Sequence, residues 1–201
     1  MKNKSFLLTL AASLILFTAS AHTDTYKVDA KESHLVWSGK KMTGQHWGTI
    51  NISGGQLQDT HGTVTGKVEV DMTSLQDTDL TGSYKAKLEG HLKSADFFEV
   101  DKYPTSVLTV TSITPLEKGK DGINTHTVKG TMTIKNHTNP IEFNVAKKDI
   151  DATHIRYSGQ LIIDRSKYDV RYGSKTFFAD IGDKMVYDDF TLIFNLALIK
   201  E

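Results

Sequence analysis

The 201-residue chain contains no cysteine and only three prolines. Without cysteine it has no disulfide framework and no thiolate chemistry, so an exported form must rely on its sheet and core for stability. With few prolines and no low-complexity stretch it shows no linker, and its length fits one domain. Basic and acidic residues number 24 each. Nothing in this balance points to nucleic acid or an anionic membrane surface as a partner.

Catalytic and metal-binding patterns are also missing. The sequence has no Gly-x-Ser-x-Gly elbow and no glycine-rich phosphate loop. Its eight histidines show none of the close spacings that bring three or four ligands onto one zinc ion. Asp96 and Glu99 are explained by a helix start signal, and we expect His91 to make a structural hydrogen bond. The sequence therefore predicts no enzyme, no metal site and no cofactor.

Long apolar runs are absent except at the N-terminus. Lys2 and Lys4 precede the apolar stretch Phe6 to Phe17, and Ala19-Ser20-Ala21 follows the small-x-small pattern of a cleavage site. A membrane anchor is the alternative, but the run is shorter than the roughly 20 residues that a bilayer requires. We predict a signal peptide at 1–21, a single domain at 22–201 with net charge −2, and a periplasmic or secreted protein without stable membrane insertion.

The rest of the chain alternates between apolar and polar residues. The clearest alternation covers 64–72, 128–134, 141–145, 155–163 and 190–198. A period of two gives each strand one apolar face and one polar, solvent-exposed face. Weaker strands are expected at 26–28, 35–39, 47–57 and 105–113. This series of eight or nine strands predicts a mainly β protein, a single antiparallel eight-stranded barrel with a short helical insertion.

Two local features refine this barrel. Asn136 to Pro140 is expected to be the turn of a hairpin. Glycines within the strands often mark bends or close approaches of two backbones, and they favour a closed barrel over a flat sandwich. These glycines are Gly39, Gly66, Gly130 and Gly159.

The helical insertion lies between the strands ending near 72 and beginning at 105. Tyr84, Leu88, Leu92 and Ala95 fall on one face at helical spacing. A second short turn is expected to carry Phe97 and Phe98, and Pro104 pushes the preceding residue toward extended geometry. One helix packed on a curled sheet predicts a barrel with a plugged or lidded end, which favours a container over a catalyst.

The stretch His91 to Phe98, followed by Lys102-Tyr103-Pro104, resembles the signature of the YceI-like family. Residues 128–134 with Pro140, and 163–168 with Gly182-Asp183, are similar to further parts of it. The resemblance covers Tyr26 to Leu198. It implies a lipocalin-like periplasmic barrel whose apolar channel holds an isoprenoid lipid, either a polyprenyl phosphate or an isoprenoid quinone.

Candidate ligand-binding residues follow from the apolar stripes and from the need for donors at the open end of the barrel, where the head group of the ligand would bind. Arg165 and Arg171 flank a short irregular segment, where arginine suits phosphate. Lys40, Lys41 and His46, expected in a polar loop, are a second set of donors, with solvated loop charges as the alternative. The apolar candidates, for which core packing is the alternative, are Leu35, Trp37, Trp47, Val68, Val70, Phe97, Phe98, Met132, Phe143, Leu161 and Phe194.

The sequence thus predicts a protein that binds, and transports or stores, an amphiphilic isoprenoid lipid. Burying each methylene of such a ligand stabilises the complex by about 0.8 kcal/mol. Two alternatives stay open: an interaction or stress-related protein with a filled barrel, and a hydrolase or isomerase that uses the tunnel. A homodimer, in which the partner is a second copy of the chain, also stays open.

Overall fold

The computed structural model describes residues 22–116 and 123–201, so the predicted signal peptide at 1–21 lies outside the described residues. Within them, no helix is long and apolar enough to cross a bilayer. The elements are β1 (Thr23–Val28), β2 (His34–Lys41), β3 (Gly44–Thr60), β4 (Thr63–Asp77), α1 (Gly82–Lys93), β5 (Thr105–Pro115), β6 (His126–Ile134), β7 (His137–Asp149), β8 (His154–Asp164), the 3-10 helices η1 (Arg165–Tyr168) and η2 (Gly182–Lys184), and β9 (Val186–Lys200).

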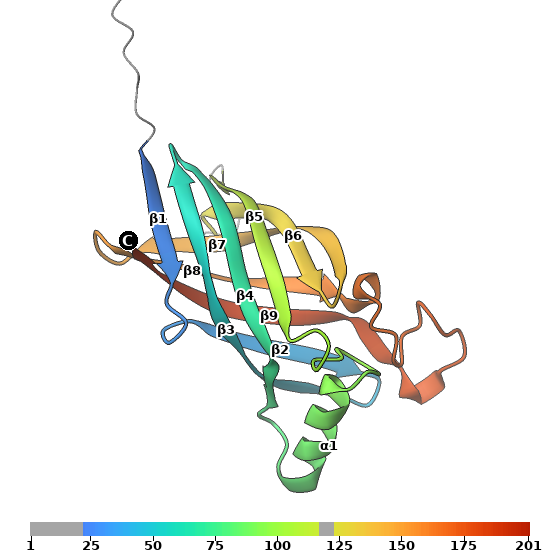
Figure 1. Ribbon diagram of the computed structural model, residues 1–201. Helices are drawn as coiled ribbons and strands as arrows, with labels where there is room; N and C mark the ends of the chain where they lie inside the picture. Colours follow the sequence, from blue (N-terminus) through green and yellow to red (C-terminus); the bar gives the residue numbers. More distant parts are fainter. Residues whose placement is uncertain (1–21, 117–122) are drawn as a thin grey trace, which may run out of the picture.

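The strands form one antiparallel sheet that closes on itself (Figure 1). The order around the sheet is β3-β2-β9-β8-β7-β6-β5-β4, and β4 pairs back onto β3. β1 takes the same place as β2, because both lie between β3 and β9 at different heights. The nine strands of the described chain therefore make an eight-stranded barrel, and the predicted fold class is confirmed.

The burial of side chains follows the alternation seen in the sequence. In β4, Val64, Val68 and Met72 are buried, whereas Lys67 and Glu69 are exposed. The same pattern repeats around the barrel, with one face of each strand turned to a common interior. Period-two alternation in the sequence thus identified the inward face correctly.

Gly130 shows why glycine is needed inside a strand. A Cβ at this position would lie 2.1 Å from the carbonyl oxygen of Thr109, and the neighbouring β5–β6 register shifts between Val110 and Ser112. Gly39 is different, because nothing lies within 4 Å of the place its Cβ would take. It stands instead beside a register shift between β2 and β9, so it marks an irregularity without a close approach.

Two turns are tighter than the sequence suggested. β2 and β3 are joined only through Met42 and Thr43, so the predicted polar loop around Lys40 and His46 is part of a hairpin. β6 and β7 are joined through Lys135 and Asn136, with Lys135 at φ 55°. The predicted turn Asn136 to Pro140 was therefore too long, since the ladder continues to the pair Ile134 and His137.

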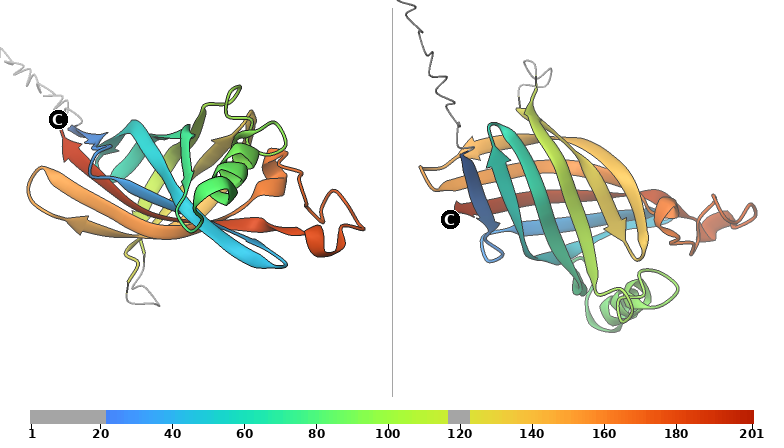
Figure 2. Two further views of the ribbon diagram at one scale, coloured as in Figure 1. Left: turned by 90° about the horizontal axis from the view of Figure 1, so that it is seen from below. Right: turned by 45° about the horizontal axis from the view of Figure 1, so that its top comes forward.

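The predicted helix is present but shorter than the pattern implied. Its last turn lies against the end of the barrel, and its first turn lies farther out (Figures 1 and 2). Leu92 is buried accordingly, while Tyr84 is 72% exposed and Ala95 lies beyond the helix, in an exposed turn. The prediction that Tyr84 and Ala95 share the packed face was wrong, because the barrel does not reach the first turn of the helix and because the helix ends at Lys93, before Ala95.

The segment after α1 forms the expected turn. Backbone N–H groups of Phe97 and Phe98 donate to the carbonyls of Ser94 and Leu92, both at 3.1 Å. Glu99 adopts a left-handed φ of 51°, so the Asp96/Glu99 signal produces a turn and no second helix. Both phenylalanines are buried.

Candidate ligand-binding site

A cavity of about 430 Å³ lies inside the barrel at the end that α1 covers. Its volume falls in the range of roughly 300–1,000 Å³ typical of small-molecule sites. α1 and the following turn contribute Leu88, His91, Leu92, Phe97 and Phe98. The remaining apolar wall comes from the strands and is made by Leu35, Trp37, Ile50, Val70, Met72, Leu75, Met132, Ile134, Ile163, Val186, Phe190 and Leu192.

Seven of the thirteen candidate residues line this cavity. Trp37 is fixed there because its indole N–H donates to the carbonyl of Gln76 at 3.0 Å. Phe97 and Phe98 contact each other edge to face, with ring centroids 5.0 Å apart. The seven residues are Leu35, Trp37, Val70, Phe97, Phe98, Met132 and Arg165.

Three more candidates face inward but lie just beyond the cavity. Val68, Leu161 and Phe194 each stand two residues past a lining residue of the same strand. Phe194 contacts Phe143, a fourth candidate outside the lining, with ring centroids 5.9 Å apart. All four pack with the core. They would be the next side chains met by a guest too long for the cavity.

The remaining two candidates lie outside. Trp47 is 47% exposed on β3, whereas the buried positions Gly48 and Ile50 belong to the inward face of the same strand. Arg171 is exposed and pairs with the carboxylate of Asp169. Neither side chain belongs to the cavity lining.

Arg165 lines the cavity, yet it is only 2% exposed and three of its five N–H donors are hydrogen-bonded to the backbone. Its guanidinium donates to the backbone carbonyls of Val170 at 2.9 Å, Val186 at 3.0 Å and Tyr187 at 3.1 Å. The carboxylate of Asp188 lies 3.3 Å away. Burial lowers the pKa of Arg165, and Asp188 opposes this shift. Arg165 therefore fixes the chain around the cavity and has little capacity left for a phosphate.

Exposed polar residues border one side of the cavity and form what we call the cavity rim: Lys40, Lys41, Thr43, Asp183 and Lys184. They come from the β2–β3 hairpin and from η2, just before β9. Three of these five side chains are lysines, so the rim carries the cations that Arg165 and Arg171 were expected to supply.

Two buried polar atoms in the lining have no hydrogen-bond partner among the described residues: Nε2 of His91 and Oγ of Ser106. His91 contacts the rings of Tyr172 at 4.3 Å and Phe97 at 5.8 Å between centroids. The sequence predicted a structural hydrogen bond for His91, but its Nε2 makes none with the described residues. Leaving such a group unpaired costs about 1–3 kcal/mol, which a polar ligand group would recover.

The opposite end of the barrel is filled by its own side chains. Leu57, Val145 and Leu198 point inward there and are at most 2% exposed. The interior is therefore divided along the barrel axis into a hollow part under α1 and a packed part beyond it. Both alternatives from the sequence, a container and a filled barrel, describe part of this interior.

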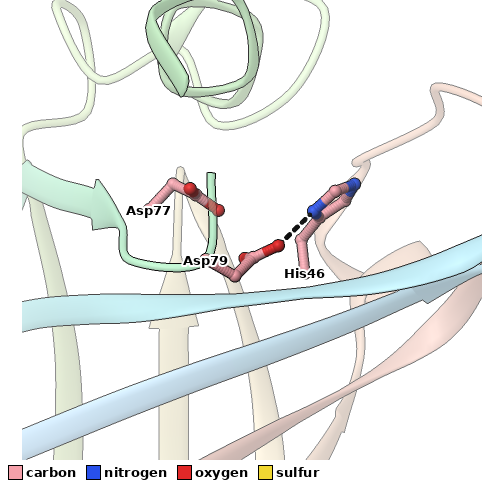
Figure 3. A group of neighbouring side chains, drawn as sticks. All are labelled: His46, Asp77 and Asp79. Carbon is pink, nitrogen blue, oxygen red and sulfur yellow. Dashed lines mark hydrogen bonds and ion pairs between the residues drawn. The ribbon is translucent and has the colours of Figure 1, made fainter. Parts of the chain in front are cut away.

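A second group of polar side chains lies beside the cavity (Figure 3). His46, Asp77 and Asp79 bring one ligand atom each to within 4.8 Å of one another. Nδ1 of His46 lies 2.9 Å from a carboxylate oxygen of Asp79. This cluster was not predicted, because His46 lies 31 residues before Asp77 in the sequence and the β3–β4 ladder brings them together.

A closed antiparallel barrel with an apolar cavity at one end defines a lipocalin-like fold. The chain belongs to the YceI-like family, since the model of the YceI-like domain matches residues 26–198. The resemblance expected from His91 to Phe98 is thereby confirmed. No curated protein sequence matches the chain.

Solved structures share this fold at low sequence identity. One is Burkholderia cenocepacia BcnA, with TM-score 0.61 and 20% identity, covering 85% of this chain and 98% of that one. Another is a polyisoprenoid-binding domain from Saccharophagus degradans implicated in plant cell wall breakdown, with TM-score 0.61, 17% identity, and coverage of 88% and 98%. A Campylobacter jejuni YceI protein gives TM-score 0.50, 16% identity, and coverage of 100% and 99%.

Proposed function

We propose that this protein binds an amphiphilic isoprenoid lipid, with the isoprenoid chain in the cavity under α1. The observation that carries the proposal is the cavity itself, about 430 Å³ and walled mainly by apolar side chains. The family and the polyisoprenoid-binding domain of Saccharophagus degradans support the choice of ligand class. Binding and carriage of a lipid need no catalytic step.

The polar groups of the cavity suggest how the head group is recognised. An uncharged oxygen, such as a quinone carbonyl, fits the unpartnered atoms of His91 and Ser106, because a charge buried there would stay unneutralised. A phosphate fits Lys40, Lys41 and Lys184 at the cavity rim, where it stays hydrated. The two ligands therefore use different polar groups of the cavity for their head groups.

The ligand length has a physical bound. A cavity of this size matches drug-sized molecules, so a long polyprenyl chain must displace Val68, Leu161 or Phe194 or extend past the rim. We propose that the cavity holds the first units of the chain, and that the protein is exported to the periplasm or secreted, where it carries or stores the lipid.

Native mass spectrometry of the protein purified from its own host tests this proposal. A retained lipid of several isoprene units supports it, and fragmentation then identifies the head group. Purified protein that is empty and takes up neither a short-chain isoprenoid quinone nor a short-chain polyprenyl phosphate from detergent would contradict it. The same spectrum gives the oligomeric state and shows whether the chain begins at His22.

Carriage is tested separately from binding. Donor vesicles containing the identified lipid are mixed with empty acceptor vesicles, with and without the protein. A protein-dependent increase in the transfer rate supports a carrier, and retention without transfer supports storage.

A further inference from the structure

Asp77 is fully buried, at 0% exposure, and sits at the end of β4 (Figure 3). Its Oδ1 accepts a hydrogen bond from the backbone N–H of Leu80 at 2.8 Å. Its Oδ2 has no hydrogen-bond partner among the described residues and belongs to the cluster with His46 and Asp79. A buried carboxylate oxygen without a donor needs a positive partner.

Asp79 is held in the same way. Its Oδ1 accepts a hydrogen bond from the backbone N–H of Trp47 at 2.8 Å, and its Oδ2 lies 2.9 Å from Nδ1 of His46. In both carboxylates one oxygen is anchored by a backbone donor, and the other is directed into the cluster. Outer hydrogen bonds that orient carboxylates in this manner are characteristic of metal ligands.

In the described chain, the basic side chain paired with these carboxylates is His46, which lies against Asp79. Among the described residues, no lysine or arginine forms an ion pair with Asp77 or Asp79. Lys85 pairs with Glu89 at 3.6 Å, and Glu89 itself accepts from the backbone N–H of Asp77. Two facing carboxylates, one of them fully buried, repel each other and favour a proton or a cation between them.

We propose that His46, Asp77 and Asp79 bind a divalent transition-metal ion of the zinc type. One imidazole and two carboxylates form a three-ligand set that leaves further coordination positions open. The imidazole favours zinc and its neighbours over calcium or magnesium. Ligand atoms about 2.0–2.2 Å from zinc lie about 3.3–3.6 Å apart in a tetrahedron. Binding would therefore shorten the longest separation in the cluster, at most 4.8 Å, and slightly widen the 2.9 Å pair of His46 and Asp79. The site does not depend on the lipid proposal, although His46 also lines the cavity.

The test uses Zn²⁺ alone with purified protein that has been dialysed against EDTA. Calorimetric titration is expected to show one zinc ion per chain and a higher melting temperature with zinc. Asp77→Asn and Asp79→Asn keep the Oδ1 acceptors for Leu80 and Trp47 but remove the ligand charge. Each is expected to weaken zinc binding by more than the roughly 10–100-fold found when groups that merely orient a ligand are lost.

The matched control is Asp151→Asn. Asp151 and His154 form a second His–Asp pair at the same 2.9 Å, but both are exposed and no second carboxylate joins them in the described chain. Zinc binding is expected to survive this change. Crystals soaked in zinc give an independent readout, an anomalous peak between His46, Asp77 and Asp79.

Three outcomes overturn the proposal: no zinc uptake by wild-type protein, binding unchanged in both Asp77→Asn and Asp79→Asn, or an anomalous peak elsewhere. The first of these would leave a proton shared by the two carboxylates as the neutralising partner. If Asp77→Asn does not fold, Asp79→Asn and the anomalous peak still decide the matter.

Discussion

The guanidinium carbon of Arg165 lies 5.3 Å from the ring centroid of Phe97. A cation over an aromatic face is attracted by the ring quadrupole, and here both partners line the cavity. Phe97 comes from the turn after α1, whereas Arg165 begins η1 after β8. This contact therefore ties the helical cover to the barrel wall across the cavity.

Replacing Arg165 with Met should destabilise the fold. Met matches the stem of arginine in length but leaves the backbone carbonyls of Val170, Val186 and Tyr187 without their donor. Loss of one partner from a buried charged network costs about 3–5 kcal/mol, and urea denaturation measures it. Lys167→Met, at an exposed neighbouring position, is the control. A cost below about 1 kcal/mol would show that the Arg165 network contributes little to stability.

Filling the cavity should abolish lipid retention. Val70→Trp places a large ring in the cavity wall, whereas Val36→Trp makes the same change on the exposed face of β2. We expect Val70→Trp to retain at least about tenfold less lipid, equivalent to about 1.4 kcal/mol, while Val36→Trp matches wild type. Met132→Trp provides a second blocking variant. Equal lipid content in all folded variants, by native mass spectrometry, would place the ligand elsewhere.

Gly130→Ala should destabilise the barrel. The added methyl would meet the carbonyl oxygen of Thr109 at 2.1 Å, so the β5–β6 backbones must separate. Such overpacking costs about 1–3 kcal/mol. Gly39→Ala, where the methyl meets nothing within 4 Å, is expected to change stability by no more than about 0.5 kcal/mol. Thermal denaturation of the two variants should differ clearly, and equal midpoints would contradict the close approach.

The fold was largely predictable because barrel strands repeat one simple pattern. Alternation identifies the inward face, so Leu35, Val70 and Met132 were correctly placed on it. Alternation contains no information about height along the barrel axis. For this reason it could not separate Val70, in the hollow part, from Val68, one step into the packed part.

The polar part of the site was harder to predict because it depends on pairing between distant residues. Arg165 looks like an accessible phosphate ligand in the sequence, and only the carbonyls that surround it in space show that three of its N–H donors are engaged. His46 and Asp77 come together through the register of two long strands, which no local spacing encodes. The unpaired Nε2 of His91 is likewise visible only once the helix is placed on the barrel.

His126 should make the barrel less stable in mild acid. It begins β6, and its ring meets that of Tyr157 edge to face at 6.5 Å between centroids. Burial lowers the pKa of His126, and Lys147 lowers it further, while Asp149 acts in the opposite direction. In the unfolded chain a histidine titrates near 6.5. Below that pH the unfolded state binds more protons than the folded state, so the free energy of unfolding falls as the pH falls.

His126→Gln removes this proton uptake, so its urea midpoint should fall less than that of wild type between pH 7.5 and pH 5. His34→Gln, at an exposed position of β2, is the control and should follow wild type. The sign is informative, because a histidine stabilised in its charged form by Asp149 would give the opposite trend. A wild-type midpoint that rises on acidification, with His126→Gln losing that rise, would show that Asp149 outweighs burial and Lys147.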